Sequence, residues 1–109
     1  MKLTPLEELS HAHFAAQVQT KFRVWINPQN SVELELTEVT AARIHGGRNA
    51  SYENFALNFA GPAVPLLPQR IYRFESAALG EFELFIVPVG QDARGTQYQA
   101  SFNRLAKAA

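Results

Sequence analysis

Hydrophobic residues recur at alternate positions along most of the chain, which is the period of a β-strand. The first such run has Phe22, Val24 and Ile26 on one face and ends at the turn-forming residues 27–31. Later runs are carried by Val32, Leu34 and Leu36; Phe55, Leu57 and Phe59; Tyr72 and Phe74; Phe82, Leu84 and Ile86; and Tyr98, Ala100 and Phe102. The alternation predicts six strands. We expect the second to continue through Val39 and Ile44, with a bend or bulge at residues 40–42.

The N-terminal segment shows a different, helical spacing of its apolar side. Thr4 and Glu7 have the spacing of a capping box, and Pro5 stands at the first helical position, where proline is tolerated. The helical positions are Leu6, Leu9, His13 and Ala16. The spacing predicts one N-terminal helix over residues 4–16.

Together these elements predict a mostly β fold, a six-stranded antiparallel barrel or strongly curved sheet with one N-terminal α-helix. Closure is expected because open strand edges invite aggregation. The chain has 109 residues, which suits a single domain. We divide it into the helix at 4–16, the β-barrel at 20–104 and a frayed tail at 105–109.

One hairpin allows its register to be predicted from the hydrophobic pattern. If Phe74 lies opposite Phe82, both side chains face the core. The same register gives the core pair Tyr72/Leu84, the outer ion pair Arg73/Glu83 and the facing carboxylates Glu75/Glu81. It leaves Ile71, Phe85 and Val87 outside the core, and we expect the N-terminal helix to cover them.

The composition excludes several kinds of chemistry. The chain has no cysteine, so it contains neither disulfides nor thiolate metal sites. Asp92 is its single aspartate, and His11 and His13 point to different sides of a helix, so they could not bind one ion together. We therefore expect no metal site and no cofactor.

The remaining catalytic patterns are also weak. The pairs Glu33/Glu35 and Glu81/Glu83 alternate with core positions, so they are expected to face solvent, where carboxylates titrate normally. The sequence contains no nucleophile elbow around a serine and no phosphate-binding loop. We expect no catalytic residues and a protein that is not an enzyme.

Two polar loops, residues 45–51 and 90–95, hold the candidate functional loop residues. These are His45, Gly46, Gly47, Arg48, Asp92 and Arg94. An enzyme hypothesis would require His45, Arg48 and Asp92 to converge at one end of the barrel. Loops at opposite ends would remove that arrangement.

The charge pattern bears on nucleic acid as a partner. Lys21, Arg23 and Trp25 share the outward face of the first strand, a pattern typical of a small base-stacking platform. The formal net charge is +0, however, and Glu33 and Glu35 are acidic neighbours. We do not expect a nucleic-acid partner.

Membrane association and export are not indicated either. The longest apolar run, residues 84–89, is far shorter than the roughly 20 residues that span a bilayer as a helix. Glu7 and Glu8 interrupt the start before an apolar signal region could form. We expect a cytoplasmic protein, or one exported by a route that does not use an N-terminal signal peptide.

Several segments carry a family resemblance. They are Phe22-Arg23-Val24 after the N-terminal helix, residues 55–62, Tyr72, residues 79–89 and residues 98–103. In these segments the chain resembles a small uncharacterised bacterial family, a domain of unknown function. The shared features are a turn glycine, core aromatic residues and strand ends, and none is a catalytic signature. Genes of this family often neighbour those of proteins with phage tail-collar domains, so the resemblance implies a role in a tail-like or surface assembly.

The leading hypothesis is therefore a non-enzymatic structural or assembly module that acts through a protein partner or self-association. Its candidate interaction surface is Trp25, Ile71, Phe85, Val87 and Arg23, because apolar side chains outside the core are typical of partner sites. The alternative is a small β-barrel that binds a small apolar ligand or single-stranded nucleic acid.

Overall fold

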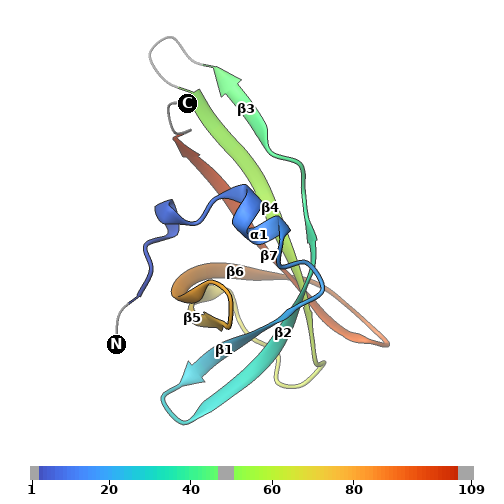
Figure 1. The fold of residues 1–109 in the computed structure, drawn as a ribbon. Helices are drawn as coiled ribbons and strands as arrows, with labels where there is room; N and C mark the ends of the chain where they lie inside the picture. Colours follow the sequence, from blue (N-terminus) through green and yellow to red (C-terminus); the bar gives the residue numbers. More distant parts are fainter. Residues whose placement is uncertain (1–2, 47–50, 106–109) are drawn as a thin grey trace.

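The structure, a computed structural model, describes residues 3–46 and 51–105 and consists mostly of antiparallel strands (Figure 1). In chain order the elements are the 3-10 helix η1 (Leu6–Glu8), α1 (His11–Ala15), β1 (Lys21–Asn27), β2 (Asn30–Val39), β3 (Arg43–Gly46), β4 (Ser51–Gly61), β5 (Arg70–Ser76), β6 (Gly80–Asp92) and β7 (Gly95–Leu105). The predicted fold class is confirmed.

Six of the strands close into a ring. Their order is β2-β1-β5-β6-β7-β4, and β2 also pairs with β4, which joins the two ends of the sheet. The remaining strand, β3, pairs with β4 alone among the described residues. It continues the second predicted strand after the break at residues 40–42, where the bend was expected.

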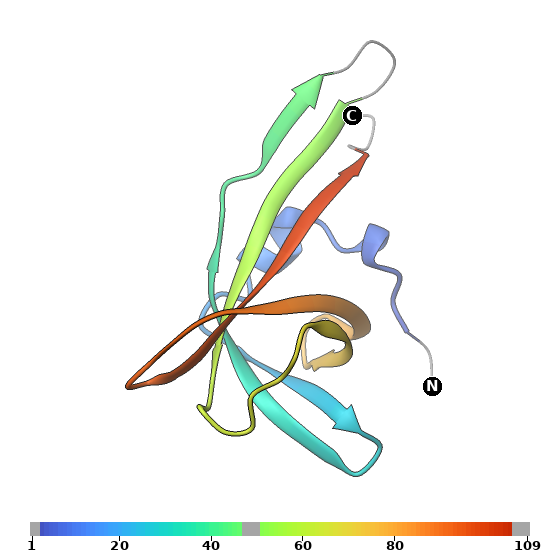
Figure 2. The ribbon, with the colours of Figure 1, turned by 180° about the vertical axis from the view of Figure 1, so that it is seen from behind.

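Three strands extend beyond the ring as a projecting arm (Figure 2). We define the arm as β3, residues 51–54 of β4 and residues 102–105 of β7. Its strands are in register through Ile44 opposite Glu53 and Glu53 opposite Arg104. The arm forms because β4 and β7 are longer than the part of the ring they help to close.

Aromatic side chains fill the interior of the ring. Phe22, Phe74 and Phe82 are each 0% exposed, and their ring centroids lie 5.7–6.4 Å apart. Phe59 lies 5.6 Å from Phe22 in an edge-to-face contact, a geometry that aromatic pairs favour. The predicted hairpin register is confirmed: Phe74 lies opposite Phe82, Tyr72 opposite Leu84, Arg73 opposite Glu83 and Glu75 opposite Glu81. The ion pair that Arg73 forms at 3.4 Å, however, is with Glu81.

The predicted helix over 4–16 is wrong in its extent and in its cap. The backbone N–H of Thr4 donates to the carbonyl of Glu81 on β6 at 2.7 Å, so the chain there is tied to the sheet. The capping box lies six residues later, where the Oγ of Ser10 accepts from the backbone N–H of His13 at 3.1 Å. In return, Nδ1 of His13 accepts from the backbone N–H of Ser10 at 3.0 Å. A cap of this kind satisfies donors that the first turn leaves unpaired.

The short helix α1 packs where the arm leaves the ring. Its Phe14 is fully buried, with its ring centroid 5.5 Å from that of Phe102 and 6.0 Å from that of Phe82. The helix therefore does not cover the outer face as expected. Ile71 and Phe85 remain 60% and 49% exposed, because the single large apolar side chain of α1 points into the core.

The predicted polar loops are shorter than expected. His45 and Gly46 belong to β3, because the ladder with β4 continues to the pair Gly46/Ser51. Gly90 and Asp92 belong to β6, and Asp92 pairs with Gly95, so residues 93 and 94 alone form that turn. Leu105 is part of β7 and not of a frayed tail. Gly47, Arg48 and residues 106–109 lie outside the described residues.

The two loops lie at opposite ends of β4. His45 faces Tyr52 near its start, and Thr96, next to the other turn, faces Gly61 at its end. At about 3.3 Å per residue, the nine steps from Tyr52 to Gly61 separate them by roughly 30 Å. The structure therefore does not bring His45 and Asp92 together, and the convergence that the enzyme hypothesis required is not found.

Candidate interaction surface

The five residues predicted as an interaction surface lie on three neighbouring strands of the ring. Arg23 and Trp25 are on β1, Ile71 is on β5, and Phe85 and Val87 are on β6. Trp25 lies opposite Arg73 of β5, and Ile71 lies opposite Phe85. Antiparallel neighbours of this kind place their side chains on the same face.

Neighbouring charges hold Trp25 in place. Its Nε1–H donates to Oε1 of Glu75 at 3.2 Å, and the guanidinium of Arg73 lies 5.0 Å from the ring centroid. Nη1 of Arg73 is also 3.4 Å from Oε1 of Glu81. The facing carboxylates therefore have different partners: Glu75 accepts from the indole of Trp25, and Glu81 pairs with Arg73. A base-stacking platform needs an aromatic ring whose face is open to the ligand. The indole of Trp25 is half-buried and has the guanidinium of Arg73 near its ring, so it does not fit this role well.

Ile71 and Phe85 line a groove with the N-terminal segment. The groove has a volume of about 540 Å³ and is lined by Leu3, Thr4, Pro5, Leu6, Glu7, Ile71, Glu83 and Phe85. Leu3 is 38% exposed at its edge. Most of the lining is apolar, and its two charged residues are both acidic. We call this feature the groove.

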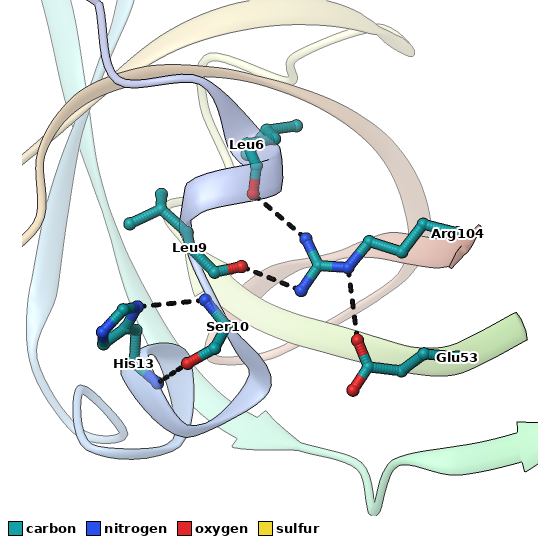
Figure 3. Close-up of polar contacts among 6 residues, drawn as sticks. All are labelled: Leu6, Leu9, Ser10, His13, Glu53 and Arg104. Carbon is teal, nitrogen blue, oxygen red and sulfur yellow. Dashed lines mark hydrogen bonds and ion pairs between the residues drawn. The ribbon is translucent and has the colours of Figure 1, made fainter. Parts of the chain in front are cut away.

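Arg104 fixes the N-terminal wall of the groove (Figure 3). Its Nη1 donates to the carbonyl of Leu6 at 3.0 Å, and its Nη2 donates to the carbonyl of Leu9 at 2.8 Å. Its Nε donates to Oε1 of Glu53 at 3.2 Å. Bonds between a guanidinium and carbonyl or carboxylate groups are among the stronger hydrogen bonds in proteins. One side chain of the arm therefore holds both η1 and Leu9, the residue that directly follows it.

Sequence reasoning missed Arg104, although it carries a signal. It follows Ala100 and Phe102 in the same alternating phase, so a charge stands at a core-facing position of the last strand. The guanidinium lies 5.3 Å from the ring centroid of Phe55 and 5.1 Å from that of Phe102. A core-facing arginine needs such partners, and they could have been sought among the backbone carbonyls of the N-terminal segment.

His11 and His13 make local structural contacts. Nε2–H of His11 donates to the carbonyl of Thr40 at 2.8 Å, and its ring packs edge-on against Phe55. His13 completes the capping box, and His45 is exposed on the arm. Within residues 3–46 and 51–105, no three His, Asp or Glu side chains gather as a metal site would require.

Among the described residues, two ionisable groups have shifted pKa values, Tyr72 on β5 and Asp92 at the end of β6. Burial raises the pKa of Tyr72, whose hydroxyl donates to the carbonyl of Pro68 at 2.7 Å. The backbone N–H of Arg94 donates to Asp92 and lowers the pKa of this exposed carboxyl at the end of β6. Asp92 and Arg94 also form an ion pair at 3.5 Å. Both shifts have a structural cause: burial beside Arg70 and Tyr98 for Tyr72, and hydrogen bonds within the β6–β7 turn for Asp92.

A family model described as a domain of unknown function, DUF6916, matches residues 9–102. The chain belongs to the DUF6916 family. The matched part includes α1 and most of the ring, with Ile71, Glu83 and Phe85 of the groove, whereas Leu3 and Arg104 lie outside it. No curated protein and no solved structure matches this DUF6916 chain. None of the helices in the described part of the chain is long and apolar enough to cross a membrane.

Proposed function

We propose that this DUF6916 chain is a non-enzymatic structural module that assembles with further copies of itself, in a phage-tail-like or surface filament. The observation that carries the proposal is the pair Ile71 and Phe85. These two large apolar side chains lie directly opposite each other on β5 and β6 and are 60% and 49% exposed. Adjacent exposed apolar side chains that line a concave surface are typical of protein–protein sites.

The packing of the ring interior supports assembly over the alternative of ligand binding inside the ring. Phe22, Phe59, Phe74 and Phe82 are 0–1% exposed and contact one another directly. Small barrels have an interior just wide enough for their own side chains, and these rings occupy it. The apolar surface available to a partner is therefore the outer one.

Sedimentation velocity over a range of concentrations tests the proposal. The double variant Ile71→Ser with Phe85→Ser is expected to weaken self-association by at least about tenfold, because truncating central apolar contacts typically costs that much. Val89→Ser is the matched control, since Val89 is also on β6 and 57% exposed but does not line the groove. Thermal unfolding checks that the variants fold.

Two results would overturn the proposal. One is a wild-type chain that sediments as a monomer at every concentration it tolerates. The other is a loss of association in the Val89→Ser control as large as that in the double variant, because the patch would then have no special role.

A further inference from the structure

A second exposed apolar feature lies on the connection between β4 and β5. Val64 is 83% exposed and Leu66 is 54% exposed, with Pro65 between them. Exposed valine and leucine side chains this close together form a small apolar protrusion. We call residues 64–66 the knob.

The knob is held in shape by contacts on either side. Leu67, directly after it, is 2% exposed, and its backbone N–H donates to the hydroxyl of Tyr98 at 3.0 Å. The carbonyl of Pro68 accepts from the hydroxyl of Tyr72 at 2.7 Å. On the other side, Nε2 of Gln91 donates to the carbonyl of Ala63 at 3.4 Å.

Prolines add to this rigidity. Pro62, Pro65 and Pro68 each have a fixed φ, so the loop has few other conformations to lose. A segment that is ordered before binding gives up little conformational entropy when it docks. The loop therefore holds Val64 and Leu66 exposed in a fixed conformation before any partner binds.

The groove offers the complementary surface on the same chain. Its floor is formed by Ile71 and Phe85 and its wall by Leu3 and Leu6. A volume of about 540 Å³ is enough for the side chains of one valine and one leucine. Burying both would remove from water most of the apolar surface that the two features now expose.

The charges around the two features are also complementary. Glu7 and Glu83 are the charged residues that line the groove. Arg70 follows the knob in sequence and is exposed. Opposite charges at the rim favour the correct orientation of two copies.

We propose that the knob of one copy inserts into the groove of a second copy, with Val64 and Leu66 against Ile71 and Phe85. This contact rests on the proposed function and specifies how the copies meet. It joins two different surfaces, so a pair of copies still has one free knob and one free groove. Contacts of this head-to-tail kind continue into a ring or an open filament rather than stopping at a dimer.

Mixing two variants, each with one surface disabled, tests this geometry. The knob variant carries Val64→Asp and Leu66→Asp, and the groove variant carries Ile71→Asp and Phe85→Asp. Each alone is expected to sediment as a monomer. An equimolar mixture is expected to form a heterodimer and nothing larger, because one intact knob and one intact groove remain between the two chains. Val89→Asp is the control and should assemble as wild type does.

The outcomes separate the two proposals. A knob variant that still self-associates through the groove, with no heterodimer in the mixture, would overturn the head-to-tail contact while leaving self-association in place. A wild-type chain that stays monomeric would overturn both. If either aspartate variant fails to fold, the milder pairs Val64→Ala with Leu66→Ala and Ile71→Ala with Phe85→Ala replace them, with an expected weakening of about tenfold.

Discussion

The ring and the arm use the same kind of strand but are stabilised in different ways. In the ring, each strand has a neighbour on both sides, and the interior side chains Phe22, Phe74 and Phe82 are fully buried. On the arm, Ile44 and Leu105 remain 59% and 63% exposed, and the sheet is too narrow to bury a face by itself. The arm instead rests on the N-terminal segment.

That difference shows what a short extension of a closed sheet needs. Phe55 and Phe102, at the base of the arm, stack with ring centroids 4.6 Å apart and contact Phe14 of α1. Farther out, Arg104 binds carbonyl oxygens of the N-terminal segment. The arm therefore depends on apolar packing at its base and on polar contacts beyond it, whereas the ring interior depends on apolar packing.

The largest expected effect is on the ring. Phe82→Ala should lower the free energy of unfolding by about 3–5 kcal/mol, because it leaves a cavity among Phe14, Phe22 and Phe74. Chemical denaturation measures the change. Phe85→Ala, three residues further along β6 and 49% exposed, should cost less than about 1 kcal/mol. Similar losses for the two variants would contradict the contrast between interior and surface.

An intermediate effect is expected at the arm. Arg104→Met keeps much of the apolar stem but removes the bonds to Leu6, Leu9 and Glu53, and should cost about 2–3 kcal/mol. Hydrogen exchange is expected to quicken in residues 3–15, while β5 and β6 keep their protection. Arg104→Lys should recover part of the lost stability, because an ammonium supplies the positive charge but cannot donate to all three acceptors as the planar guanidinium does. Uniform loss of protection across the ring would show that the arm and ring are not separable.

The smallest effect concerns pH and Tyr72 in the ring. Its pKa is raised by burial, so the unfolded chain loses the phenolic proton first, near the ordinary value of about 10. Its contribution to stability is therefore fully present below pH ~10 and declines as the pH rises toward the folded-state pKa. Denaturant midpoints measured across this range should fall for the wild type and fall less for Tyr72→Phe. Tyr52→Phe on the arm, where the side chain is 45% exposed, should keep the wild-type profile. A Tyr72→Phe chain with an unchanged alkaline loss would contradict the assignment.

Part of the fold followed from local pattern. The alternation of Tyr72, Phe74, Phe82 and Leu84 was enough to predict both strands and their register, because a slip of one residue would turn every apolar side chain outward. The break at residues 40–42 could also be seen, since the small and polar residues there interrupt the alternation.

The N-terminal segment could not be predicted in the same way. Thr4 and Glu7 match the capping-box pattern better than Ser10 and His13 do, but the structure has the cap at Ser10, and Thr4 is bonded to β6 instead. Arg104 is separated from Leu6 by 98 positions, so its role depends on how the strands curve. The groove could not be predicted for the same reason: its lining residues come from the N-terminal segment and from β5 and β6, which are far apart in the sequence.

The sequence by itself determined which side chains face the interior of this DUF6916 chain, because the two-residue period of a strand assigns each position to a face. It thereby placed six phenylalanines of the strands in the core and left Ile71 and Phe85 outside, whereas the burial of Phe14 in α1 was not predicted. Only the tertiary structure decided how the sheet closes, through the pairing of β2 with β4, and where the N-terminal segment lies. The physical reason is that those contacts join residues far apart in the chain, and the curvature of the closed sheet sets their separation.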